Sequence, residues 1–236
     1  MNPDIAAVLA GERQWCVVTG DCRDILPTLP DKSVDAVVTD PPYGVGFKYD
    51  SYDDTRENWF ALMDAVMPQV RRSARFVVLP SCKVKLLGWW YHHHCPEWQI
   101  VWCKGSPGHV STIGFNDYEP LLTWGKPMKP MHDHFYARCE DFQTDGHPCP
   151  KSVEWARWLV SRSTNPGAIV LDPFAGSFTT GVACVELGRR FIGVEVSPAY
   201  CDVGRARLKA AEAQGQLFAS SPPTVVDDGD LYAQHE

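Results

Sequence analysis

Short runs of β-branched and other apolar residues alternate with helix-like stretches along most of the chain. This alternation is typical of a parallel sheet, because a helix must return the chain to the edge at which the next strand begins. The expected strands are 15–18, 34–39, 76–79, 99–103, 119–124, 168–171 and 191–194. The expected helices are 58–72, which Pro68 interrupts, 81–93, 152–161, 177–187 and 198–212. The sequence therefore predicts an α/β fold, with helices on both faces of a mostly parallel twisted sheet.

A chain of 236 residues is long enough for one α/β domain with a full core, and too short for two large ones. We expect that domain to span residues 1–212. Residues 125–150 are irregular and rich in Pro, His and Met, which indicates an insertion rather than part of the core. Residues 213–236 are acidic and polar, and we expect a disordered acidic tail there.

Composition favours an intracellular protein. Hydrophobic residues make up 44% of the chain and charged residues 22%, as in ordinary globular domains. No apolar run approaches the roughly 18 residues of a membrane span, so no membrane segment is expected. The amino-terminal residues lack the basic start and apolar centre of a signal peptide. Nine cysteines without a regular framework indicate a reducing compartment, and we expect a cytoplasmic protein.

The net charge of −7 argues against a nucleic-acid partner, but the distribution of charge weakens that argument. Residues 71–129 contain eight Lys or Arg and three acids, which gives +5. Residues 211–236 contain five acids and no Lys or Arg. The middle of the chain is therefore suited to face phosphates, although a solvated surface of mixed charge explains the same pattern equally well.

The segment AIVLDPFAGSFTTG is typical of a strand, a turn of small residues and a helix. Asp172 closes the strand, and Ala175, Gly176 and Ser177 let the backbone approach a ligand at the start of the helix. The next strand ends in Glu195, where a carboxylate can accept the hydroxyls of a ribose. Together these features predict a nucleoside-bearing cofactor, and the missing GxxxxGK(S/T) pattern argues against a triphosphate. Taken singly, Asp172 is equally well a helix cap and Gly176 a tight turn.

The segment Asp40-Pro41-Pro42-Tyr43 follows a buried strand and forms a stiff turn, because each proline fixes φ and lacks an N–H. The Asp40 carboxylate and the Pro41 carbonyl can both accept from an amino group, while the Tyr43 ring stacks on a planar ligand. Those two hydrogen bonds would make the amine nitrogen a better nucleophile by positioning and electrostatics. On its own the tetrapeptide is as readily explained as a turn that starts a loop.

The segments TDPPYG, DPFAGSFTTG and GVEVSPAYCDVGRARL together resemble the DNA amino-methyltransferases of the circularly permuted β class. The resemblance covers about residues 15–210 and includes WCKGSPGHVSTIGFNDYEPLLTWGK and GHPCPKSVEW. It implies a Rossmann-like, S-adenosylmethionine-dependent methyltransferase fold. In this class the catalytic segment precedes the cofactor segment, and moving the chain ends to a point before residue 15 breaks no strand.

The resemblance also implies roles for individual residues. It places Asp40, Pro41, Pro42 and Tyr43 at the target amine. Cofactor contacts are implied for Asp21, Cys22, Asp40, His147, Lys151, Ser152, Asp172, Phe174, Ala175, Gly176, Ser177, Glu195 and Val196. Two positions depart from the pattern of the class, which usually has Gly where this chain has Phe178, and Pro where it has Ser152. Phe178 would either crowd the methionine end of the cofactor or point into the core.

The implied reaction is direct methyl transfer to the exocyclic amine of a flipped base in double-stranded DNA, as in restriction–modification systems. Asp before Pro-Pro-Tyr favours N6 of adenine, with N4 of cytosine as the alternative. Two rivals are a protein-glutamine methyltransferase, against which the motif order argues, and an inactive DNA-binding homologue. The class also implies a prokaryotic or phage-encoded protein. The short insertion at 125–150 predicts a short or relaxed target sequence, or help from a second subunit in a homodimer.

Other clusters carry weaker predictions. Adjacent histidines at 92–94 point in different directions on a helix, so no metal site is expected there. A zinc site is a minor alternative for the cluster of His132, His134, Cys139, His147 and Cys149, whose spacing matches no common zinc pattern. The aromatic residues of the loop 47–52 are candidates for DNA contact or, equally, for a local core.

Overall fold

The structure is a computed structural model. It describes residues 1–49, 51–81, 84–104, 110–111, 114–115, 117–137 and 152–218, without the side chains of 84, 85, 110, 111, 114, 115 and 216–218. The strands are β1 Trp15–Thr19, β2 Val34–Val38, β3 Ala74–Pro80, β4 Trp98–Cys103, β5 Val110–Ser111, β6 Gly114–Phe115, β7 Tyr118–Gly125, β8 His134–Tyr136, β9 Ile169–Asp172 and β10 Arg190–Glu195. The helices are α1 Pro3–Ala10, α2 Cys22–Ile25, η1 Leu26–Thr28, α3 Arg56–Ser73, α4 Val84–His93, α5 Val153–Ser163, α6 Thr179–Glu186 and α7 Pro198–Phe218.

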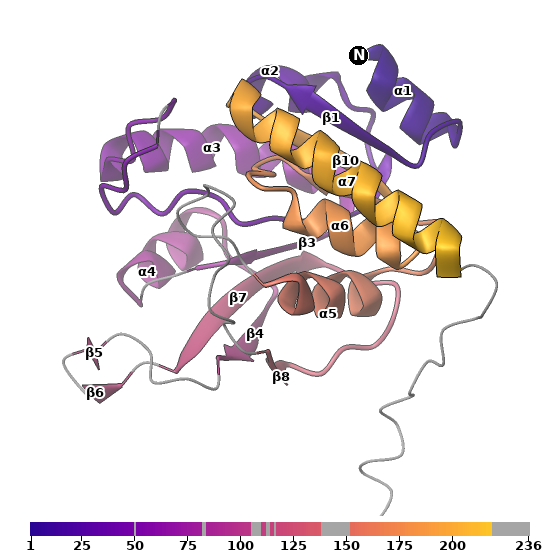
Figure 1. Cartoon of the computed structure of the whole chain (residues 1–236). Helices are drawn as coiled ribbons and strands as arrows, with labels where there is room; N and C mark the ends of the chain where they lie inside the picture. Colours follow the sequence, from indigo (N-terminus) through magenta and orange to yellow (C-terminus); the bar gives the residue numbers. More distant parts are fainter. Residues whose placement is uncertain are drawn as a thin grey trace, which may run out of the picture.

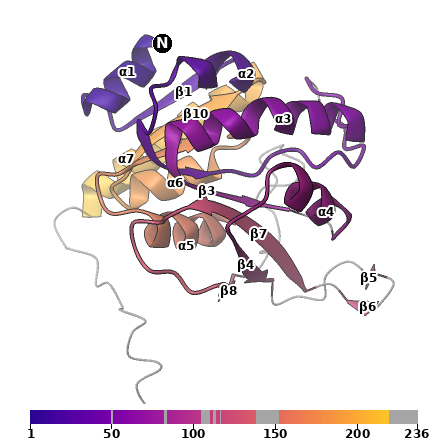
Figure 2. The same cartoon turned by 180° about the vertical axis from the view of Figure 1, so that it is seen from behind.

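Eight of these strands form one sheet in the order β1-β10-β9-β2-β3-β7-β4-β8. The strands from β1 to β3 are parallel to their neighbours, β7 runs antiparallel to both β3 and β4, and β8 pairs in parallel with β4. Helices α5, α6 and α7 cover one face (Figure 1), and α3 and α4 lie on the other (Figure 2). The expected α/β fold with a mostly parallel sheet is therefore confirmed.

The order of the strands reverses between β9 and β2. From β9 the chain passes through α6 to β10 on one side, and from β2 it passes through α3 to β3 on the other. The two connections lie on opposite faces, so they part at the carboxyl ends of β9 and β2. A ligand crevice is expected at this point in open α/β sheets.

The two ends of the domain are joined to each other. The Arg190 guanidinium donates to the carbonyls of Val8 and Leu9 at the end of α1, at 2.8 and 3.1 Å. At the start of β1, Trp15 Nε1 donates to Glu212 Oε2 of α7 at 3.4 Å. Helix α7 thus lies beside the start of β1, as expected from the resemblance to a circularly permuted class.

Three elements differ from the expectations. Helix α3 continues through Pro68, which lies on the exposed side of the helix, where water can satisfy the carbonyl that the proline leaves unpaired. The segment expected to be irregular contains β8, whose Phe135 is buried beside β4. Helix α7 extends to Phe218, so the tail expected from residue 213 begins as helix. Residues 138–151 and 219–236, the rest of the insertion and tail, lie outside the described residues.

Among the described helices, none is both long enough and apolar enough to cross a membrane.

Phe178 points into the core. It caps the start of α6 with φ +63°, a left-handed conformation that side chains rarely adopt, and its side chain is fully buried. Its ring fills the space left by Gly193 of β10 and Gly204 of α7, where an added Cβ would lie 2.5 and 2.1 Å from ring atoms. Of the two orientations expected for Phe178, the structure shows the one directed into the core.

This packing predicts that Gly204→Ala destabilises the fold. The new methyl group overlaps the Phe178 ring, so the free energy of unfolding should fall by about 1–3 kcal/mol, as in other overpacked cores. Gly215→Ala on the same helix is the control, because an added Cβ there has no neighbour within 4 Å among the described atoms. It should be neutral or stabilising. Urea unfolding measures both variants, and equal effects would contradict the packing.

Candidate active site

Four adjacent strands bring carboxylates to one edge of the sheet. Glu195 and Asp172 close β10 and β9, and Asp21 and Asp40 follow shortly after β1 and β2. The strand order β1-β10-β9-β2 places these four acids in a row along the carboxyl edge. The sequence predicted each of them separately, and the sheet brings them together on both sides of the point where the strand order reverses.

A buried hydrogen bond joins the two halves of the site. Thr39 Oγ1, just before Asp40, donates to Asp172 Oδ1 at 2.6 Å, and both side chains are buried. The Phe174 amide donates to the same carboxylate oxygen at 3.1 Å. The end of β2 and the turn after β9 are therefore fixed to one acid.

Burial raises the pKa of Asp172 from 3.8 to about 7. The hydrogen bonds from Thr39, Phe174 and Thr180 lower this pKa and the nearby charge of Asp40 raises it, but both are smaller than the effect of burial. An acid that titrates near neutral pH at a strand end is typical of a functional site, although structural networks also produce such shifts.

Glu195 organises the turn that precedes α6. Its Oε2 accepts from the Gly176 amide at 2.9 Å, and its Oε1 accepts from the Ser197 amide at 2.8 Å. Gly176 has φ +51°, which favours glycine, and the Ala175 amide donates to the Val194 carbonyl at 3.0 Å. The turn therefore folds back over the end of β10, with a carboxylate at its centre.

The other predicted cofactor residues differ in their surroundings, from the buried core to the exposed surface. Asp21 caps α2, and its ion pair with Arg23 at 2.5 Å lowers the pKa of its carboxyl. The Cys22 thiol packs in the core, where burial raises its pKa to about 12. Ser177 is buried and its carbonyl accepts from the Arg207 guanidinium at 2.6 Å. Val196 is exposed at the end of β10.

One further predicted cofactor residue, Ser152, lies at the start of α5. Ser152 caps α5 by accepting from the Trp155 amide at 3.2 Å. Serine at this position therefore has a structural role in starting the helix. His147 and Lys151 lie outside the described residues.

The turn Asp40–Tyr43 is held from outside by a tryptophan of α3. Trp59 Nε1 donates to the Pro42 carbonyl at 2.5 Å, and an added Cβ at Gly44 would lie 2.9 Å from the Trp59 Cβ. The Tyr43 hydroxyl donates to Asp40 Oδ1 and also lies 3.3 Å from Glu119 Oε1 of β7. The turn is therefore held at the Pro42 carbonyl and the Tyr43 hydroxyl, and at Gly44, which follows it.

Asp54 anchors the loop that follows the Asp40–Tyr43 turn. Its buried carboxylate accepts from the amides of Gly44, Val45 and Phe47 at 2.7, 3.0 and 3.1 Å. The same loop borders a hollow of about 720 Å³ lined by Gly46, Phe47, Lys48, Tyr49, Ser51, Tyr52 and Asp53. The Tyr49 ring lies 4.8 Å from that of Phe47 and 6.2 Å from that of Tyr52, so these aromatics contact one another at the edge of an open space.

Sequence reasoning missed several residues that build this site. Thr39, Trp59 and Glu119 bond to predicted residues, and Asp54 holds the loop beside them. Asp54 and Trp59 lie outside the recognised segments, and Thr39 and Glu119 lie inside them but had no role assigned. The signal for Glu119 was an acid at the start of the apolar run EPLLTW, where a buried carboxylate needs a partner. That partner is Lys104, whose Nζ lies 2.8 Å from Glu119 Oε2.

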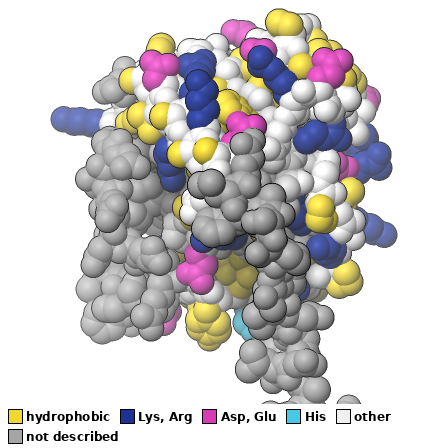
Figure 3. Space-filling view, turned by 45° about the vertical axis from the view of Figure 1, so that its right-hand side comes forward, with side chains coloured by type: hydrophobic (Ala, Val, Ile, Leu, Met, Phe, Trp, Pro, Cys, Tyr) yellow, Lys and Arg dark blue, Asp and Glu magenta, His cyan; other side chains and the backbone are white. Residues whose placement is uncertain are grey.

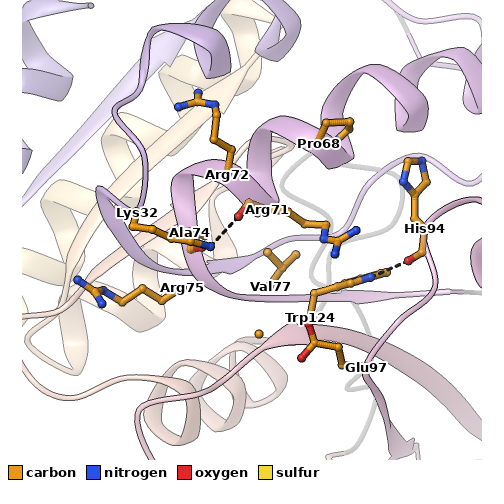
Figure 4. A pocket seen from close by; sticks show the side chains of 11 residues that line it. Lys32, Pro68, Arg71, Arg72, Ala74, Arg75, Val77, His94, Glu97 and Trp124 are labelled. Carbon is orange, nitrogen blue, oxygen red and sulfur yellow. Dashed lines mark hydrogen bonds between the residues drawn. The ribbon is translucent and has the colours of Figure 1, made fainter.

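A second cavity lies at the opposite edge of the sheet, where β3 begins and β7 ends (Figure 4). It measures about 390 Å³, and among its basic side chains Lys32 bonds to carbonyls at the end of α3. Lys32 Nζ donates to the Arg71 carbonyl at 2.8 Å and to the Ala74 carbonyl at 2.6 Å, and Arg72 is paired with Asp31. We therefore assign this cavity to the structure of α3 and not to the site.

The surface in Figure 3 carries Lys and Arg side chains over its upper and right-hand parts, with acidic side chains between them. The described part of this face is therefore mixed in charge, as in one of the two interpretations that the sequence allowed. No group of three or more His, Cys, Asp or Glu side chains suited to a metal ion occurs among the described residues, which do not include Cys139, His147 and Cys149.

The raised pKa of Asp172 predicts how stability depends on pH. A carboxyl whose pKa is higher in the folded than in the unfolded state loses stabilisation as pH rises from about 3.8 to about 7. Asp172→Asn keeps the oxygen that accepts from Thr39 and Phe174 and removes the titration. The variant should therefore gain stability over the parent between pH 5 and pH 8, on the order of 2 kcal/mol. Urea unfolding without ligand measures this, and a difference independent of pH would contradict it.

The hydrogen bond from Trp59 predicts a difference between two buried tryptophans. Trp59→Phe and Trp90→Phe both remove part of a buried ring, but only Trp59 also loses a hydrogen bond, because the Trp90 N–H has no partner among the described residues. Trp59→Phe should therefore destabilise the fold by about 1 kcal/mol more than Trp90→Phe. Thermal unfolding compares them, and the opposite order would show that this bond does not hold the turn.

Residues 98–206 match the DNA methylase family model for N6 and N4 enzymes. YubD of Escherichia coli is 29% identical over 222 residues, which cover 86% of this chain and 94% of YubD. The DNA adenine methyltransferase YhdJ of Escherichia coli is 27% identical over 259 residues, which cover 85% of each chain.

Among solved structures, the complex of M1.HpyAVI with S-adenosylmethionine superposes with a TM-score of 0.61 at 25% identity. The superposition covers 82% of this chain and 98% of that one. The Rossmann-like methyltransferase fold expected from the sequence is thus confirmed. The resemblance to the DPPY-type DNA amino-methyltransferases is confirmed with it, because residues 98–206 match the N6/N4 DNA methylase model and the similar proteins are of this kind.

Proposed function

We propose that this protein transfers the methyl group of S-adenosylmethionine to N6 of adenine in DNA. The observation that carries the proposal is the bond between Thr39 and Asp172, which fixes the Asp40–Tyr43 turn beside the turn that precedes α6. An amine held at the first turn would therefore lie next to a cofactor held at the second. The match to DNA methylases supplies the substrate class.

The cofactor turn fits a nucleoside that carries a charged tail. Glu195 offers carboxylate oxygens for ribose hydroxyls, Asp21 lies one strand further along, and Gly176 keeps the backbone close to any ligand. Asp172 lies on the side toward Asp40, and a carboxylate there attracts a cation. When bound, S-adenosylmethionine supplies an electrophilic methyl group on a positively charged sulfur.

The residues of the catalytic turn act on the amine. Asp40 and the Pro41 carbonyl accept its two N–H groups, which directs the nitrogen lone pair away from the ring and toward the methyl group. The Tyr43 ring stacks on the base. After the methyl transfer the nitrogen is positively charged and still holds both of its protons, and the Asp40 carboxylate, which already accepts from one of them, would take that proton. The base must leave the duplex stack to reach this turn.

Two observations favour adenine and an active enzyme. YhdJ, which has an adenine-specific name, aligns over most of both chains. Phe178 packs in the core against Gly193 and Gly204, so its ring does not crowd the turn before α6, which supports an active enzyme over an inactive homologue. N4 of cytosine remains the alternative, because the amine of cytosine offers the same two donors.

The partners follow from the same proposal. The DNA lies over the carboxyl edge of the sheet, with the loop 44–53 against the extruded base. Residues 125–137 add only one short strand to the sheet, so sequence recognition depends on the rest of the insertion or on a second copy of the chain. A short or relaxed target sequence is expected. We also infer that the protein acts in the compartment that holds the DNA.

The proposal predicts the outcome of a transfer assay with labelled S-adenosylmethionine and DNA, followed by nucleoside analysis. The parent should produce N6-methyladenine. Asp40→Ala should bind S-adenosylmethionine within about threefold of the parent and lose transfer by at least about 100-fold, because it removes the main acceptor for the amine. Asp24→Ala, which removes an exposed acid at α2, is the control and should match the parent.

Each outcome of that assay separates one part of the proposal. N4-methylcytosine as the product would make the base assignment wrong and leave the enzyme class intact. Transfer by Asp40→Ala at the parental rate would remove the proposed role of Asp40. No binding of S-adenosylmethionine by the parent, alone or with DNA, would exclude the enzyme.

A further inference from the structure

The Tyr43 hydroxyl lies between two carboxylates. It donates to Asp40 Oδ1, and Glu119 Oε1 is 3.3 Å from the same oxygen. A phenol has one proton, so it can donate well to only one carboxylate at a time. Of the two contacts the one to Asp40 is the closer, so the proton serves Asp40, the group that the proposed function assigns to the target amine.

Glu119 is fixed in place as a second acceptor. It lies at the start of β7, opposite Trp102 of β4, and its side chain is only 5% exposed. Its other oxygen, Oε2, is 2.8 Å from Lys104 Nζ, and that ammonium lies 5.1 Å from the centre of the Trp102 ring. A buried carboxylate requires such a partner to remain charged. Lys104 therefore binds Oε2, while Oε1 lies toward the Tyr43 hydroxyl.

The amine and the Tyr43 hydroxyl compete for Asp40. An amine that donates to Asp40 must either displace the hydroxyl or share the carboxylate with it. Rotation about the phenol C–O bond is enough to turn the proton from Asp40 to Glu119, because Glu119 Oε1 is already within hydrogen-bond distance. The ring itself does not need to move, so it can stay in place to stack on the base.

We propose that Glu119 is a positioning residue that takes over the hydrogen bond of the Tyr43 hydroxyl when the target amine binds Asp40. The inference rests on the proposed function. It assigns to β7, far in sequence from the catalytic turn, a direct influence on how strongly Asp40 can hold the amine. A hydrogen bond to a charged group contributes enough that its loss should reduce transfer roughly tenfold or more.

The test is a double-mutant cycle with single-turnover transfer to DNA as the readout. Glu119→Leu removes the second acceptor, so the transfer rate should fall about tenfold while the affinity for S-adenosylmethionine stays within twofold. Tyr43→Phe removes the competing hydroxyl and keeps the ring. Adding Glu119→Leu to Tyr43→Phe should therefore change the rate by less than about twofold. A further tenfold loss in that background would overturn the inference.

A second variant separates the acceptor from the ion pair. The double variant Glu119→Gln with Lys104→Met keeps a carbonyl oxygen that can turn to Tyr43 and removes both charges. Its transfer rate should stay within about threefold of the parent, and a tenfold loss would show that the ion pair, not the acceptor, is what matters. This variant also carries the test if Glu119→Leu does not fold.

The control is Glu97→Leu, which removes an exposed acid close to the start of β4 and should leave the rate unchanged. Failure of the inference and failure of the proposed function give different results. If the parent itself transfers no methyl group, the proposed function fails. If the parent transfers and the cycle is additive, only the role of Glu119 fails.

Discussion

The site depends on one buried hydrogen bond, between Thr39 and Asp172. These residues are 133 positions apart in the chain, and the bond joins the residue just before the Asp40–Tyr43 turn to the acid that closes β9. It forms only because β2 and β9 are neighbours in the sheet. The pairing of β2 with β9 therefore determines the distance between the Asp40–Tyr43 turn and the turn that precedes α6. The raised pKa of Asp172 is a consequence of the same burial.

The Asp40–Tyr43 turn is also held by residues from the antiparallel part of the sheet and from α3. Strand β7 brings Glu119, which is paired with Lys104 just after β4, to the Tyr43 hydroxyl, and α3 brings Trp59 to the Pro42 carbonyl. A rigid proline turn alone fixes φ at two positions but does not determine where the turn sits. Its location is determined by these contacts from distant segments, each of which satisfies a polar group that the turn itself leaves open.

The sequence was informative where local chemistry decides structure. The strands that end in Asp172, Glu195 and Asp40 were readable because apolar runs end at an acid and a turn, and their order in the chain indicated the permuted fold. It was uninformative where partners are distant. No local pattern connects Glu119 to Tyr43, or Asp54 to the amides of Gly44, Val45 and Phe47 before it.

The sequence also misled where tertiary contacts outweigh local preference. Pro68 does not end α3, because buried residues on both sides of it hold the helix to the sheet. Strand β8 was hidden in a segment rich in Pro and His, and it forms by pairing with β4 rather than by its own propensity. Helix α1 was not expected, although Asn2 caps it and Gly11 ends it in the usual way.

The ring of Phe178 occupies volume left by two glycines, on β10 and α7. Each of these three positions makes the other two harder to change: a side chain at Gly193 or Gly204 has no room while the ring is present, and a glycine at position 178 would leave a void. The three positions are therefore coupled in free energy. The effect of a substitution at any one of them depends on which residues occupy the other two, so their single effects should not add.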